Sequence, residues 1–246
     1  MKKNLLFISL ICFSLSSNAD TQNTELAKKE IQSKNYEKAL VYAKKALKND
    51  ELENKSDRNI TIAIDYNNIA YIYVKLKKYD QALDFYNKTL EIKKKIYKKE
   101  SKSLTITYNN IAQLYENKKD YKNALKYYQK ALNAYETLLD KDHAYRIFTL
   151  KDISRMYEYL DKPFQAAKNY KEALMIQERI LPKTHPDLYE AYLKMANLSE
   201  RTEALNDALV YYEKAKKLHL YLYKDDKKHL EKLNQKIDYL NKKVLK

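Results

Sequence analysis

The sequence predicts an all-α protein built from stacked helical hairpins, and three observations indicate this. The stretch Tyr-Asn-Asn-Ile-Ala at 66–70 recurs at 108–112, which is 42 residues later. Alanine recurs at nearly the same step, at Ala39, Ala82, Ala124, Ala166 and Ala208. Small residues follow seven positions later, at Ala46, Thr89, Ala131, Ala173 and Ala215. Three columns that share one register are typical of an internal repeat.

The chain opens with the layout of a secretory signal peptide over residues 1–19. Lys2 and Lys3 precede an apolar run at 5–15, and small residues follow it up to Ala19. The run has 11 residues, whereas a spanning helix needs about 20. We therefore expect cleavage after Ala19 and export to the periplasm or outside the cell. The alternative is an N-terminal helix that stays attached as an anchor.

Each repeat unit reads as two amphipathic helices. In one unit the apolar residues follow helical spacing, with Ile69, Tyr73 and Leu76 on the first helix and Ala82, Tyr86 and Leu90 on the second. Alanine suits the crossing of the two helices, because axes about 8 to 10 Å apart leave little room for a large side chain. Short polar turns carry Asp or Pro where the second helix begins. The expected hairpins span 20–50, 58–99, 100–141, 142–183 and 184–224.

The last segment, 225–246, has an apolar stripe at helical spacing, with lysines between its members: Leu230, Leu233, Ile237, Leu240 and Val244. A terminal element of a repeat stack must cover the last core face. We therefore expect a capping helix. The alternative is an amphipathic helix that binds a membrane surface or a partner.

Composition excludes several classes of enzyme and cofactor site. The chain has no glycine, so it cannot form a glycine-rich phosphate loop or a dinucleotide fingerprint. Its single cysteine, Cys12, lies in the signal segment and leaves no thiol for a metal or a nucleophile. His143 and His185 are 42 residues apart in equivalent loops, so they follow the repeat. We expect no catalytic residue, no metal site and no cofactor.

Several residues of the repeat resemble a known family, namely Ala70, Tyr73, Tyr79, Ala82 and Tyr86. They look like the tetratricopeptide repeat, and the 42-residue period with Asn-Asn-Ile-Ala resembles the kinesin-light-chain variety. Residues 181–188 resemble the loop that joins repeats in that variety, here in a chain of exported bacterial type. The resemblance covers about 24–223. It implies an α-solenoid, a right-handed superhelix of about five hairpins closed by the capping helix. The family usually has glycine at the position of Ala70, where this chain has alanine.

The resemblance also implies a concave groove lined by the first helices, where the family holds peptides. The matching positions predict a peptide-binding set of Asn67, Tyr71, Asn109, Gln113, Lys151, Arg155, Lys194 and Asn197. Asparagine amides can hold both N–H and C=O groups of an extended backbone. Lys151 and Arg155 would select an acidic side chain or a C-terminal carboxylate. Asn68 and Asn110 would instead bond a neighbouring helix, so we expect one groove-facing and one structural asparagine in each pair.

The formal net charge of +15 admits other partners. Loss of the signal segment would leave 46 basic against 33 acidic residues, which could attract nucleic acid, anionic lipid or an acidic protein. Only five of the basic residues are arginine, the residue that suits phosphate and base recognition best. We therefore expect no specific nucleic acid as a partner. The densest basic patches are 93–95 and 214–246.

The predicted function is that of a non-enzymatic scaffold or adaptor that binds a protein or peptide partner in the groove. The alternative is a cationic protein that binds the envelope surface or a polyanion through its lysine-rich faces. After the signal segment no stretch is apolar enough to span a membrane. A weak association with the envelope surface would still be compatible with the charge.

Overall fold

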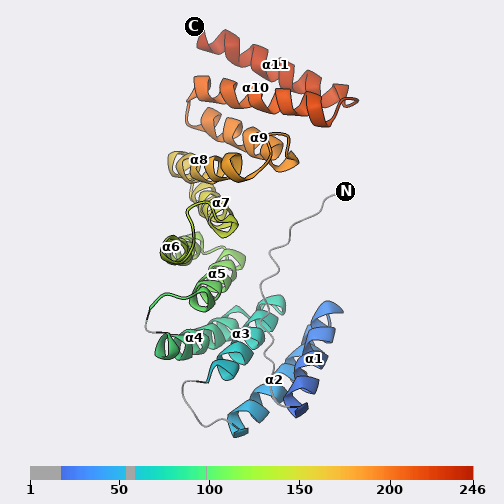
Figure 1. The fold of residues 1–246 in the computed structure, drawn as a ribbon, viewed down its shortest axis with the longest axis vertical. Helices are drawn as coiled ribbons and strands as arrows, with labels where there is room; N and C mark the ends of the chain where they lie inside the picture. Colours follow the sequence, from blue (N-terminus) through green and yellow to red (C-terminus); the bar gives the residue numbers. More distant parts are fainter. Residues whose placement is uncertain (1–17, 54–58, 98, 246) are drawn as a thin grey trace. The chain divides into compact units, whose positions relative to one another are not determined.

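The computed structural model describes residues 18–53, 59–97 and 99–245. Within these ranges the regular elements are helices and no strand forms. The order is shown in Figure 1: α1 (Asn18–Gln32), α2 (Tyr36–Glu53), α3 (Ile60–Lys75), α4 (Tyr79–Ile96), α5 (Lys102–Asn117), α6 (Tyr121–Leu138), α7 (Ala144–Tyr159), α8 (Pro163–Ile180), α9 (Pro186–Arg201), α10 (Leu205–Leu222) and α11 (Lys227–Val244). Of the expected signal segment, only Asn18 and Ala19 lie inside the described residues.

The helices group into two compact units that divide between Leu138 and Leu139. The first unit holds α1 to α6 and the second holds α7 to α11. Within each unit every helix packs against the next one along the chain, and the two helices of a hairpin make the closest association. This pattern confirms the predicted all-α solenoid of helical hairpins.

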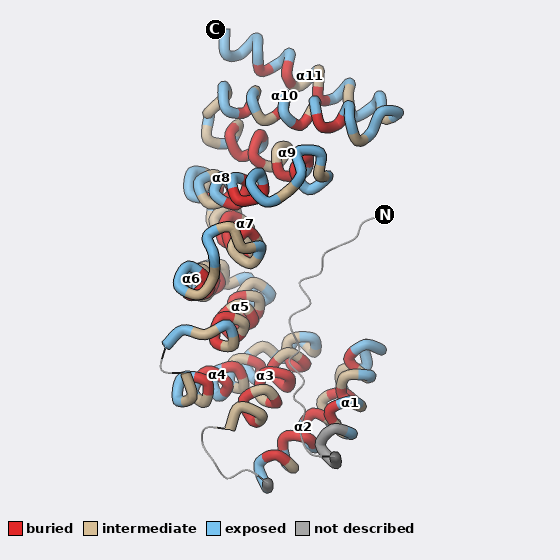
Figure 2. The backbone as a smooth tube through the Cα atoms, viewed as in Figure 1, coloured by how far each residue is buried: buried red, intermediate tan, exposed pale blue. Residues whose placement is uncertain are grey.

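The alanine columns lie where paired helices meet. Ala82, Ala124, Ala166 and Ala208 are completely buried, and so are most members of the second column. Tyr86 and Tyr128 are also buried and fill the wider space beside the crossings. Burial is concentrated on the faces that neighbouring helices turn toward each other (Figure 2). Small side chains at the crossing allow the close approach of the helix axes.

The turn inside each hairpin contains one residue with left-handed backbone. These residues recur at the repeat step and have φ between 51° and 60°: Lys34, Lys77, Lys119, Asp161 and Glu203. In one such turn the N–H groups of Lys119 and Asp120 donate to the carbonyls of Glu116 and Tyr115, each at 2.9 Å. Glycine is the usual residue at this position of a helix terminus, but the chain has none.

His143 and His185 have a structural role at the start of α7 and α9. Each places its Nδ1 3.2 Å from a backbone N–H, that of Tyr145 and that of Asp187 respectively. They accept these hydrogen bonds as N-cap residues, which satisfies donors that the first turn of a helix leaves unpaired.

The asparagine pairs join successive first helices. Asn110 Nδ2 on α5 donates to Asn67 Oδ1 on α3 at 3.0 Å, and both residues are at most 5% exposed. Asn68 is buried as well. The expectation of one groove-facing member in each pair is therefore wrong for Asn67 and Asn68. The reason is that α3 and α5 touch directly, so a position expected to face a ligand meets the next repeat instead.

The last helix covers the end of the second unit. α11 packs on α10 and buries the centre of its apolar stripe, Leu233, Ile237 and Leu240. Lys236 Nζ lies 2.8 Å from Glu200 Oε2 on α9. The centre of the stripe is thus covered by protein, as the capping prediction requires.

Part of the lysine content is used inside the fold. Lys93, from one of the densest basic patches, is buried and donates to Ser103 O at 3.0 Å and to Thr107 Oγ1 at 2.9 Å. In three hairpins a lysine amine also lies over two aromatic rings, with 5.0 to 5.9 Å to the ring centroids: Lys88 over Tyr66 and Phe85, Lys130 over Tyr108 and Tyr127, Lys214 over Tyr192 and Tyr211.

Lys119→Gly should stabilise the protein, because glycine adopts a positive φ without the steric cost that a Cβ atom adds. We expect the free energy of unfolding in urea to rise by about 0.5 to 1 kcal/mol. Lys126→Gly, at an exposed position inside α6, is the control and should lower it by about 1 kcal/mol. Equal destabilisation by both changes would contradict the assigned backbone geometry.

Asn110→Ala should lower the free energy of unfolding by about 1 to 3 kcal/mol, because it leaves the buried Asn67 amide without its partner. The double variant Asn67→Ala with Asn110→Ala should cost less than the sum of the two single changes. Urea unfolding of all four proteins measures this coupling. Asn133→Ala, at an exposed position on α6, serves as the control, and strictly additive effects at 67 and 110 would show that the bond is absent.

Candidate functional site

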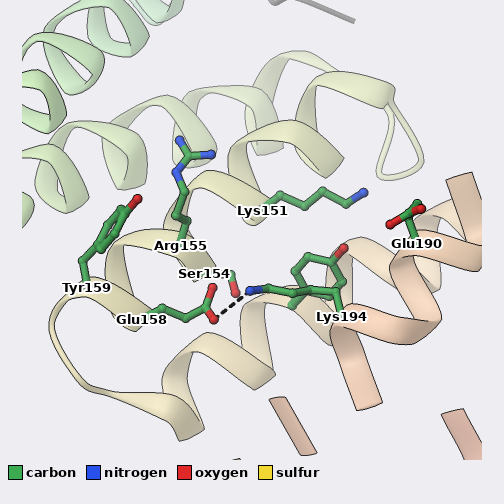
Figure 3. Close-up of a pocket in the computed structure, with 8 residues that line it drawn as sticks. Lys151, Ser154, Arg155, Glu158, Tyr159, Glu190 and Lys194 are labelled. Atoms are coloured by element: carbon green, nitrogen blue, oxygen red, sulfur yellow. Dashed lines mark hydrogen bonds and ion pairs between the residues drawn. The ribbon is translucent and has the colours of Figure 1, made fainter. Parts of the chain in front are cut away.

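A pocket of about 540 Å³ opens between α7, α8 and α9 in the second unit. Residues of both first helices, α7 and α9, line it, together with one from α8 (Figure 3). Its volume lies in the range of about 300 to 1,000 Å³ that is typical of ligand sites. The lining residues are Lys151, Ser154, Arg155, Glu158, Tyr159, Tyr170, Glu190 and Lys194.

The pocket holds three cationic side chains. Lys151 and Arg155 are one turn apart on α7, so they share one face of that helix, and Lys194 comes from α9. Lys194 Nζ lies 2.7 Å from Glu158 Oε1, and Arg155 forms an ion pair of 2.7 Å with Asp152. Figure 3 shows the three charged groups spread around the pocket.

Lys151 differs from the other two cations in its surroundings. Its amine lies 5.5 Å from the centroid of the Tyr170 ring. Burial lowers the pKa of the Lys151 amine, and the charge of Asp187 opposes this shift only in part. A cation that has lost part of its hydration shell gains more from a nearby anion than one that is fully solvated.

The structure brings together three of the eight predicted site residues, Lys151, Arg155 and Lys194. It does not place the charged groups of Lys151 and Arg155 side by side, and selection of one carboxylate by both residues stays a prediction. Both side chains rise from one face of α7, but their long flexible stems carry the charges apart. Asn197 lies outside this lining, and its Oδ1 is 2.8 Å from the Tyr212 hydroxyl.

The other four predicted residues belong to the first unit. Asn67 is buried in the bond to the next repeat. Asn109 is half-buried, and its Nδ2 donates to the Tyr135 hydroxyl at 3.1 Å. Tyr71 and Gln113 are half-buried, and the Lys75 amine lies 5.0 Å from the centroid of the Tyr71 ring. Tyr71 and Gln113 keep part of the accessible surface that a partner would contact.

Sequence reasoning missed five lining residues. Glu158 and Tyr159 lie one turn beyond Arg155 on the same helix face, so helical spacing could have found them. Glu190 precedes Lys194 by one turn in the same way. Tyr170 comes from a second helix, and a rule restricted to first helices cannot identify it. Ser154 is buried and donates to Ala166 O at 2.8 Å, so it closes the floor.

The chemistry of the pocket suits the binding of an anion. It offers cationic and aromatic groups to an anion. Its two carboxylates can be displaced from their present partners by that anion, or they can position the backbone of a bound ligand. Across 18–53, 59–97 and 99–245 no group of three or more His, Cys, Asp or Glu residues is arranged to hold a metal ion. In the same ranges no helix has the length and apolar content needed to cross a membrane.

Several solved structures share this fold at low sequence identity. The putative kinesin light chain of Podosopora anserina, with nearly identical TPR-like repeats, is 15% identical with a TM-score of 0.70, covering 82% of this chain and 96% of that one. BtubC (BKLC) from P. vanneervenii is 19% identical with a TM-score of 0.69, covering 82% and 80%. The apo form of RapI is 19% identical with a TM-score of 0.65, covering 87% and 74%.

No curated protein matches the sequence. The model of the tetratricopeptide repeat matches residues 18–95 and 103–179, which together form more than half of the chain. This match agrees with the paired helices, the alanine crossings and the similar solved structures. The chain therefore belongs to the tetratricopeptide-repeat family.

Proposed function

We propose that this protein is a non-enzymatic scaffold or adaptor that binds an acidic segment of a protein partner on its first helices. The fold itself is that of a scaffold for protein interactions. The observation that supports binding of an acidic segment is that three cationic side chains from two first helices, Lys151, Arg155 and Lys194, line one pocket. Carboxylates of a partner would form charge-assisted hydrogen bonds there.

Lys151 would contribute most to this binding. Its amine is partly withdrawn from water, and a carboxylate would restore the favourable environment that burial removes. Arg155 and Lys194 are already paired with Asp152 and Glu158. Such partly exposed ion pairs contribute only about 0 to 1 kcal/mol, so a partner can exchange them for its own carboxylates.

The spread of the three cations favours a partner with several acidic side chains over one with a single carboxylate. Tyr159 is 53% exposed at the edge of the pocket. It supplies a flat surface for the apolar part of such a segment. The alternative function, a binder of polyanions or of the envelope surface through scattered lysines, depends only on overall charge and would be sensitive to salt.

The test is affinity capture from the native organism with the chain from Asp20. The variant Lys151→Met with Arg155→Met should lose a partner that the unaltered chain retains at physiological salt. The control, Lys168→Met with Lys171→Met, removes the same charge from exposed positions of α8 and should retain it. Because burial already disfavours the charged amine, Lys151→Met should leave the melting temperature unchanged or higher. If all three proteins capture one mixture that moderate salt removes, the alternative is correct.

We also propose that the protein is exported to the periplasm or secreted, with its signal segment removed after Ala19. The support is the pattern of charged, apolar and small residues in 1–19. N-terminal sequencing of the protein purified from native cells should therefore begin at Asp20. Recovery of the chain with Met1 still attached would refute the cleavage, and a cytoplasmic location would refute the export.

A further inference from the structure

The hairpins α7–α8 and α9–α10 carry different side chains at one equivalent place, where the first helix of the hairpin begins and its second helix ends. In α7–α8 two ion pairs occupy it. Arg146 Nη2 lies 3.0 Å from Glu172 Oε1, and Arg179 Nε donates to Asp142 Oδ1 at 2.8 Å. These four side chains tie the preceding loop and both helices of that hairpin together.

In α9–α10 none of the four charged groups is repeated. The residues 42 positions later are Thr184, Leu188, Lys214 and Tyr221. Neither ion pair can form from these side chains. A pocket of about 520 Å³ is present at this place, lined by Glu178, Lys183, Thr184, Leu188, Tyr192, Lys214, Lys217, Leu218 and Tyr221.

The interior of this pocket is apolar and aromatic. Leu188 and Leu218 are almost completely buried and form its floor. Tyr192 is half-buried, while Tyr221 is 61% exposed although it is a large ring. A flat apolar group would contact both leucines and could stack on a tyrosine ring, as aromatic pairs prefer.

The rim of the pocket is cationic. It carries Lys183, Lys214 and Lys217 against one carboxylate, Glu178. Glu178 Oε1 is already engaged, because it accepts from the Tyr192 hydroxyl at 3.0 Å and from Lys214 Nζ at 2.9 Å. In the part of the chain that the structure describes, Lys183 and Lys217 form no ion pair, so they give the rim an excess of positive charge.

We propose that this pocket binds a small aromatic carboxylic acid, with the ring on the leucine floor and the carboxylate at Lys183 and Lys217. The pocket volume is typical of small-molecule sites. The combination of an apolar interior and cations without an ion pair in the rim matches a ligand that is apolar at one end and anionic at the other. The site shares no lining residue with the pocket between α7, α8 and α9 that contains Lys151, so it is independent of the proposed scaffold function.

Indole-3-acetate and tryptamine are suitable probes, because they share a ring and carry opposite charges. The chain has no tryptophan but 25 tyrosines, so the anisotropy of indole emission reports on the probe alone when the excitation wavelength is too long for tyrosine to absorb. In titrations with the full chain, indole-3-acetate should bind saturably and tryptamine about tenfold or more weakly, since a nearby pair of lysines repels a cation.

The pocket can be closed with the side chains that occupy the preceding hairpin. The variant Thr184→Asp with Tyr221→Arg should weaken indole-3-acetate binding about tenfold or more by filling the site. Lys183→Met with Lys217→Met removes the charge and leaves the cavity open, so it should weaken indole-3-acetate binding and strengthen tryptamine binding by removing the repulsion. This second variant keeps the test valid if the first fails to fold by circular dichroism.

The control is Lys168→Met with Lys171→Met, at exposed positions of α8 that line neither pocket, and it should bind indole-3-acetate as the unaltered chain does. Equal binding of both indoles, undiminished binding by the closed variant, or no saturable binding would each overturn the proposal. Binding of an acidic aromatic peptide without binding of the free acid would overturn it too. These outcomes leave the scaffold function untouched, because that function depends on other residues.

Discussion

The structure depends on close contact between paired helices at a buried alanine. Ala82, Ala124, Ala166 and Ala208 have no accessible surface, and any larger side chain would push the helix axes apart. This constraint repeats at every hairpin, so it sets how each first helix is held against its second helix. The positions of polar side chains on the first helices follow from it, including those that line the pocket between α7, α8 and α9.

A chain without glycine has to make tight turns by other means. Here the left-handed position of every hairpin turn is taken by Lys, Asp or Glu, whose long or short polar side chains remain in water. The backbone bonds of the turn satisfy the last helical carbonyls. The fold tolerates the steric cost of a positive φ at these residues, because packing of the two helices determines the fold more strongly than the turn does.

The cationic character of the chain is distributed over several roles. Lys93 is buried in the joint between α4 and α5, and three other lysines each lie over two aromatic rings. The positive balance is therefore a poor guide to a partner by itself. The informative cations are those beside a cavity, namely Lys151 near Tyr170 and the rim lysines Lys183 and Lys217.

By itself the sequence determined the helical hairpins, the alanine crossings and the C-terminal cap, because these depend on helical periodicity within about 42 residues. The resemblance to the repeat family also selected Lys151, Arg155 and Lys194, which line one pocket in the structure. Only the tertiary structure decided that Asn67 is buried, since contact between α3 and α5 is not encoded in the spacing of one helix. The two pockets likewise depend on side chains from several helices, whose directions only the packing fixes.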